Sequence, residues 1–93
     1  MEHRYGKFIW DTGREEANIA KHGVDFTIAA RAFMDPGRKI FVDSKHSTAE
    51  PRYFCIGKVN SRIITVRFIY REGQVRIFGA GYWRKGKVYY EKD

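Results

Sequence analysis

The fold is decided by residues 52–83, which read RYFCIGKVNSRIITVRFIYREGQVRIFGAGYW. Three runs rich in β-branched and aromatic residues alternate there with two short polar stretches. The runs are residues 52–59, 62–70 and 75 to roughly 83, and the stretches are 60–61 and 71–74. Such runs predict strands, and the polar stretches predict tight hairpin turns. Because strands joined by tight hairpins are antiparallel, the segment predicts an antiparallel meander.

Capping residues delimit two helices upstream of the meander. Asp11 is placed to cap a helix over residues 12–22, and Gly23, which readily adopts the left-handed conformation, ends it. A second helix begins near Asp25, and its apolar residues repeat with the spacing of one buried helical face. These apolar residues are Phe26, Ala29, Ala30 and Phe33.

The remaining segments complete the predicted fold. Short strands are expected at residues 7–10 and 39–42, and a polar loop at 43–50. Residues 84–93 fit a short helix, a strand or a flexible tail. The expected fold class is α+β, with two N-terminal helices packed on a mainly antiparallel sheet of four to five strands in a two-layer sandwich. Residues 1–93 are expected to form a single domain, because this length accommodates one core.

The charge balance indicates a polyanionic partner. Eighteen Lys and Arg residues oppose eleven Asp and Glu, a net charge of +7, and cations that neutralise phosphates gain free energy from counterion release. An acidic protein partner fits the same charge. The chain has no membrane-spanning segment, no signal peptide and one cysteine, Cys55, so it is expected to be cytoplasmic. It also lacks phosphate-loop, dinucleotide and zinc-ligand motifs, so no cofactor and no metal are expected.

A polar stripe follows one face of the first predicted helix. Its members, spaced i, i+4, i+7 and i+8, are Arg14, Asn18, Lys21 and His22. The stripe either follows an RNA backbone or is the solvated outer face of an amphipathic helix.

Arg76 stands among apolar residues in the last strand of the meander. Strict alternation predicts three companions on its strand face, namely Phe78, Ala80 and Tyr82. A buried arginine is costly without an anionic partner. Arg76 is therefore expected either to pair with Glu50 or Glu91 or to face a phosphate-binding groove.

The polar loop supplies residues suited to proton transfer. It contains Asp43, His46 and Glu50, and Arg52 follows directly. Metal-free RNA cleavage needs a base for the 2′-hydroxyl, an acid for the leaving oxygen and fixed positive charge at the phosphate, and these residue types provide all three.

Cations and rings interleave near the C-terminal end. Arg84, Lys85 and Lys87 lie between Tyr82-Trp83 and Tyr89-Tyr90. Rings in such a segment either stack on unpaired bases while the cations hold the backbone, or close the edge of the core.

Taken together, these segments resemble the BrnT family of toxins. The residues that carry the resemblance are Phe8-Ile9-Trp10-Asp11, Asn18, Lys21-His22-Gly23-Val24, Phe26, Asp35-Pro36, Asp43, Glu50, Arg52, Gly57, Arg76-Ile77-Phe78-Gly79-Ala80 and Tyr90-Glu91. The resemblance covers almost the whole chain and implies a compact fold like that of RelE-type ribonuclease toxins. It further implies RNA cleavage without a cofactor, neutralisation by a ribbon-helix-helix antitoxin in a heterotetramer, and binding of operator DNA through that antitoxin.

The resemblance and the basic charge together suggest site residues for an endoribonuclease. The residues expected to be catalytic are His22, Glu50, Arg52 and Arg76. The residues expected to bind RNA are Arg14, Asn18, Lys21, Arg67, Arg84 and Lys85. The arginines and lysines would hold and neutralise phosphate, and His22 or Glu50 would transfer protons.

One segment departs from the family pattern. The closing motif of the family often reads Ile-Ser-Ala-Arg, whereas this chain reads Phe78-Gly79-Ala80-Gly81, with Arg84 or Lys85 as candidates to supply the missing charge. The departure motivates an alternative, a non-catalytic toxin homologue that binds the antitoxin and acts as co-repressor of its own operon. A general RNA-binding module is the third possibility.

Overall fold

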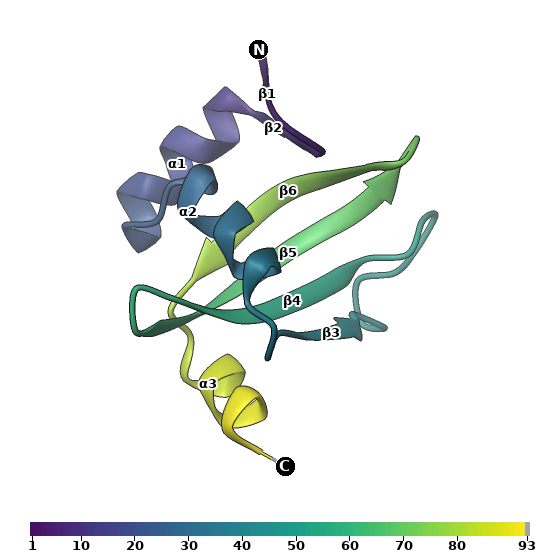
Figure 1. Ribbon diagram of the computed structural model, residues 1–93. Helices are drawn as coiled ribbons and strands as arrows, with labels where there is room; N and C mark the ends of the chain where they lie inside the picture. The colour runs from purple at the N-terminus through teal and green to yellow at the C-terminus, as the bar shows by residue number, and fades with distance from the viewer. Residues whose placement is uncertain (93) are drawn as a thin grey trace.

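A mixed sheet of six strands forms the centre of the computed structural model, which describes residues 1–92 (Figure 1). The order across the sheet is β1-β2-β6-β5-β4-β3. The strands are β1 (Glu2–Tyr5), β2 (Phe8–Asp11), β3 (Lys39–Val42), β4 (Tyr53–Val59), β5 (Arg62–Arg71) and β6 (Gln74–Gly81). The helices are α1 (Thr12–His22), α2 (Phe26–Arg31) with its 3₁₀ continuation η1 (Ala32–Met34), and α3 (Arg84–Glu91). Within residues 1–92, none of the helices is long and apolar enough to cross a membrane.

The antiparallel meander expected from residues 52–83 is confirmed as β4, β5 and β6. Both of its turns use left-handed backbone. Asn60 and Ser61 have φ values of 50° and 67°, and Glu72 and Gly73 have values of 52° and 75°. Positive φ at both central residues is the signature of a type I′ turn, whose twist matches that of the strands it joins.

The prediction of two N-terminal helices on a two-layer sheet of four to five strands is wrong, although the α+β class holds. The missed strand is β1, which pairs antiparallel with β2. All four of its residues are exposed, so no alternation of apolar side chains reveals it in the sequence. β2 in turn pairs in parallel with β6 at Phe8 and Ile9, which makes the sheet mixed.

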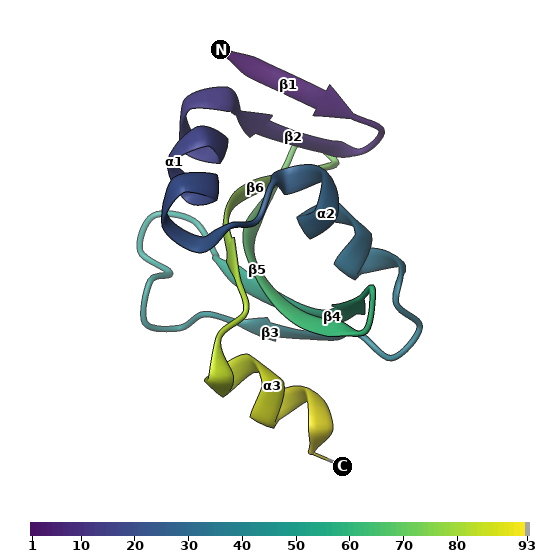
Figure 2. The same cartoon turned by 90° about the vertical axis from the view of Figure 1, so that its left-hand side faces the viewer.

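Helices cover both faces of the sheet, so the two-layer expectation also fails (Figure 2). α1, α2 and η1 pack on the face that carries the main core, where Trp10, Phe26 and Phe68 are fully buried. α3 packs on β4 and β5 from the opposite face, and Gly86 lies directly against Thr65. Of the three possibilities for the C-terminal segment, residues 84–91 form a helix; Asp93 lies outside the described residues.

A β-bulge at Phe78 changes which side chains of β6 share a face of the sheet. The register shifts between Arg67 and Phe68 of β5, so that Phe78 has no partner on that strand. Arg76 and Phe78 face the α3 side of the sheet, whereas Ala80 points into the main core and is fully buried. The expected sharing of one face by Arg76 and Ala80 is therefore wrong, because one extra residue reverses the alternation.

The expected helix caps are confirmed. The Asp11 carboxylate accepts a hydrogen bond from the backbone N–H of Arg14 at 3.0 Å, and Asp25 accepts one from Ile28 at 2.8 Å. Gly23 ends α1 with a φ of 70°, and its N–H reaches back to the helix. These caps fix where α1 starts, and hence where Arg14 lies.

Candidate functional site

A hollow of about 230 Å³ opens on the α3 side of the sheet, at the end of β6 remote from α3. Its lining comes from the start of α1, the loop before β4, the end of β5 and the first half of β6. We call it the arginine hollow, and its lining residues are Arg14, Glu50, Arg52, Ile69, Arg71, Arg76, Ile77 and Phe78. Four residues singled out in the sequence, Arg14, Glu50, Arg52 and Arg76, thus meet at one place.

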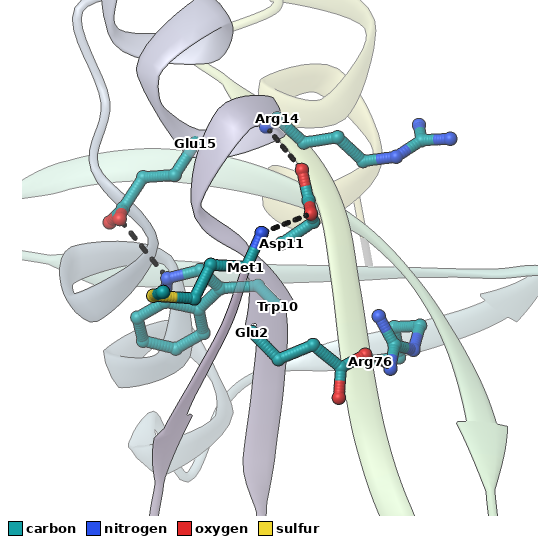
Figure 3. A network of polar contacts seen from close by, with 7 residues as sticks. All are labelled: Met1, Glu2, Trp10, Asp11, Arg14, Glu15 and Arg76. Atoms are coloured by element: carbon teal, nitrogen blue, oxygen red, sulfur yellow. Dashed lines mark hydrogen bonds and ion pairs between the residues drawn. The ribbon is translucent and has the colours of Figure 1, made fainter.

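Arg76 is a partly buried cation of the hollow, with 21% of its side chain exposed. Its Nη2 donates to the carboxylate of Glu2 on β1, so its partner is neither Glu50 nor Glu91 (Figure 3). Its Nε is buried and has no hydrogen-bond partner within residues 1–92. A buried donor of this kind is costly to leave unsatisfied. Arg76 therefore combines the two expected situations, since it is ion-paired and also lines a groove.

Arg71 is a member of the hollow that the sequence reading missed. Its Nη2 donates to the Glu50 carboxylate at 2.7 Å, and both side chains are about half exposed. The sequence predicts a hairpin turn at residues 71–74, but Arg71 is the last residue of β5. Its spacing of two from Ile69 places it on the face that also carries Arg67, which is the signal that could have identified it.

The ring of Phe78 contacts two guanidinium groups. Cζ of Arg52 is 5.0 Å from the centre of the ring, and Cζ of Arg67 is 5.2 Å away. Cations at this distance from a ring are attracted by its quadrupole. The Arg67 side chain lies over Gly79, where a Cβ would make ordinary van der Waals contact with Arg67 Cδ at 3.7 Å. Phe78, at the bulge, thus holds one arginine from β5 and one from the segment before β4.

Met1 and Asp11 hold the start of α1, where Arg14 lies (Figure 3). The N-terminal amine lies 3.3 Å from Asp11 Oδ1, while Asp11 Oδ2 accepts from the Arg14 backbone N–H. That backbone hydrogen bond, followed by the bond from the amine, holds the pKa of Asp11 below its ordinary value. Asp11 thus engages the backbone of Arg14, which lines the hollow.

Asn18, expected in the RNA-binding stripe, lies in the interior with 8% exposure. Its Nδ2 donates to the carbonyls of Val24 and Ala80 at 2.9 Å each, and its Oδ1 accepts from the Ala80 N–H at 3.2 Å. β6 pairs with β2 only near its start, so its edge at Ala80 is open. The Asn18 amide satisfies both groups of Ala80 as a neighbouring strand would, and this geometry is that of a structural residue.

The other two members of the stripe lie at the far end of α1. His22 is eight residues from Arg14, about 12 Å along a helix axis, and packs edge-on against Trp83 with ring centres 5.1 Å apart. It does not line the arginine hollow. Lys21 is exposed beside it. The structure thus separates His22 from Glu50, Arg52 and Arg76.

The C-terminal cations also lie apart from the arginine hollow. Arg84 lines a second hollow at the end of the sheet next to α3, and Lys85 is exposed on α3. At Gly81, a Cβ would lie 2.7 Å from the Trp83 ring, so the indole occupies the space of any larger residue there. Neither Arg84 nor Lys85 brings its charge into the arginine hollow.

The fold and this site define an α+β protein with clustered arginines on one face of its sheet. Residues 10–86 match the family model described as "Ribonuclease toxin, BrnT, of type II toxin-antitoxin system", and the chain belongs to that family. The matched range includes every residue that lines the arginine hollow. A comparison with curated proteins gives no match. Membership of a type II toxin–antitoxin family implies an antitoxin partner.

Proposed function

We propose that the chain is a metal-independent endoribonuclease that cleaves RNA at the arginine hollow, thereby inhibiting translation and growth. The observation that carries the proposal is the convergence of Arg14, Arg52, Arg71 and Arg76 on one site in a chain of the ribonuclease-toxin family. Glu50 is the one carboxylate in the lining of that hollow. Four guanidiniums against two carboxylates, Glu50 in the lining and Glu2 on Arg76, leave a net positive site, which suits a phosphodiester.

The chemistry suited to these residues is transfer of the phosphoryl group to the neighbouring 2′-oxygen. Glu50 accepts the proton of the 2′-hydroxyl as that oxygen forms a bond to phosphorus, and the bond to the 5′-oxygen breaks. The leaving oxygen takes a proton from water, and the products are a 2′,3′-cyclic phosphate and a 5′-hydroxyl. Arg52 and Arg76 stabilise the additional negative charge on the phosphate oxygens in the transition state.

His22 has no part in this chemistry, because it packs on Trp83 at the other end of α1. Arg67 lies over Gly79 next to the hollow and is assigned to binding of the flanking RNA backbone. Lys21 and Lys85, both exposed, would act only through long-range attraction of RNA. Asn18 is assigned to the fold rather than to RNA.

The antitoxin that we propose is a ribbon-helix-helix protein that forms a heterotetramer with this chain and carries it to operator DNA. The type II family and the resemblance described above support this part of the proposal. A protein that acts in this way on cellular RNA would work in the cytoplasm.

Induction of the chain alone in bacterial cells tests the proposed function. We expect growth arrest with breakdown of total RNA, reversed by co-expression of the neighbouring antitoxin gene. Arg52→Ala and Glu50→Gln should remove the arrest, whereas Arg31→Ala, an arginine on α2 outside the hollow, should retain it. Normal growth with intact RNA, despite accumulation of folded protein, would contradict the proposal and favour a non-catalytic antitoxin-binding co-repressor.

A further inference from the structure

A second hollow, at the end of the sheet next to α3, has a volume of about 470 Å³ and combines rings with cations. The β4–β5 hairpin, the segment after β6 and one side of α3 enclose it. The residues that matter here are Lys58, Arg62, Tyr82, Trp83, Arg84 and Lys87, and we call the site the aromatic hollow. None of these residues contributes to the arginine hollow.

Arg62 and Tyr82 form a preassembled stack within the aromatic hollow. Cζ of Arg62 lies 3.4 Å from the centre of the Tyr82 ring, the separation of two planes in contact. Arg62 is an exposed residue, so its side chain is accessible from solvent. A planar cation already stacked on a ring offers its other face to a nucleobase, and arginine planes stack on unpaired bases in RNA-binding proteins.

The charge of the aromatic hollow suits phosphate. Lys58, Arg84 and Lys87 are exposed, and with Arg62 they oppose one lining carboxylate, Glu91. Among residues 1–92, none of these four cations takes part in an ion pair. Their charge is therefore not neutralised locally and attracts an anion from solution.

The aromatic hollow lies at the end of the sheet, because Arg62 pairs with Val59 of the main core and Tyr82 packs against that core, whereas α3 lies on the other face. Alternate residues of β5 connect it with the arginine hollow on the α3 side, from Ile63 in the aromatic hollow to Ile69 and Arg71 in the arginine hollow. Arg67 occupies the same face between them. Ile63 of the aromatic hollow and Ile69 of the arginine hollow are six residues apart in β5, which is about 20 Å along a strand. At the rise of about 3.4 Å per stacked base, this span equals about six nucleotides, and fewer if the RNA is extended.

We propose that the aromatic hollow is a second RNA-binding site, which stacks an unpaired base of the substrate on Arg62 while Lys58, Arg84 and Lys87 hold the adjoining phosphates. The inference rests on the proposed function, since it extends the path of the RNA beyond the phosphate that is cleaved. An acidic segment of the antitoxin is the competing occupant. The preformed planar stack favours RNA, because a carboxylate needs charge but no stacking platform.

Equilibrium binding of a fluorescent, fully 2′-O-methylated single-stranded RNA of about 12 nucleotides tests the second site without cleavage, because the nucleophile is blocked. Arg62→Lys keeps the charge and removes the plane, and should weaken binding about tenfold, in the range measured for loss of one base stack. Lys87→Ala should weaken binding less and lower its salt dependence. Arg31→Ala is the matched control.

Equal affinity of wild type and Arg62→Lys for the 12-nucleotide RNA would overturn the second site. Unchanged RNA affinity together with weakened antitoxin binding would assign the hollow to the antitoxin instead. A different result would contradict the proposed ribonuclease function alone: the unmodified RNA stays intact, while the methylated RNA still binds in an Arg62-dependent manner.

Discussion

Replacement of Asn18 with alanine should destabilise the protein strongly without touching the arginine hollow. The substitution removes three hydrogen bonds to the buried backbone of Val24 and Ala80. It leaves two carbonyls and one N–H without partners, and each such loss costs about 1 kcal/mol. The expected loss is about 3 kcal/mol, which is a large part of the roughly 5–14 kcal/mol total stability of a chain of this length.

Urea unfolding and thermal melting measure this loss. For a domain of this size, 3 kcal/mol corresponds to a decrease in Tm of about 12–24 °C. Glu16→Ala, an exposed position on the same helix, should stay within about 0.5 kcal/mol of wild type. An Asn18→Ala protein that melts like wild type but has lost affinity for RNA would refute the structural role and restore Asn18 to the RNA-binding stripe.

Three further predictions concern stability and the approach to Arg76. The Tyr90 hydroxyl lowers the pKa of Asp35 below its ordinary 3.8. The stability from this contact is therefore present above that value and lost as pH falls through the lowered pKa. Unfolding followed from about pH 5 to about pH 2 should show this pH-dependent loss of stability in wild type and not in Asp35→Asn. Thr65→Val should stabilise the chain by about 1 kcal/mol in urea unfolding, because the buried Thr65 hydroxyl has no partner in residues 1–92; a destabilised variant would contradict this. Glu2→Gln removes the anion that pairs with Arg76 and should tighten RNA binding severalfold in a titration; unchanged affinity would show that Glu2 does not compete with phosphate.

The elements that the sequence predicted are those with strong local signals. Type I′ turns, helix caps and runs of β-branched residues depend on neighbouring residues, so β4 to β6 and both N-terminal helices were predictable. β1 was not, because its four exposed side chains show no apolar period and backbone pairing with β2 holds it. The sequence does not decide between a helix, a strand and a tail for residues 84–91, because the packing of α3 depends on the contact of Gly86 with Thr65, which is distant in the sequence.

The residues of the candidate site also differ in how far the sequence alone predicts their positions. Glu50, Arg52 and Arg76 were named from residue type and from the family resemblance, and the fold places them together. The pairing of Arg76 with Glu2 could not be predicted, because Glu2 lies on β1, a strand that the sequence does not reveal. The sequence predicts Asn18 in the RNA-binding stripe, but its amide binds the backbone of Ala80. Helical spacing shows which residues share a face, but not whether one of them faces an open strand edge.

The most direct test of the central claim is cleavage of a labelled single-stranded RNA by the purified chain in excess EDTA, for wild type and Arg76→Ala. The account predicts that wild type cleaves without divalent metal and leaves a 2′,3′-cyclic phosphate. Loss of the Arg76 guanidinium should reduce the rate by about 10²-fold or more while the melting curve shows a folded protein. Intact RNA at every wild-type concentration, or equal rates for the two proteins, would contradict catalysis at the arginine hollow.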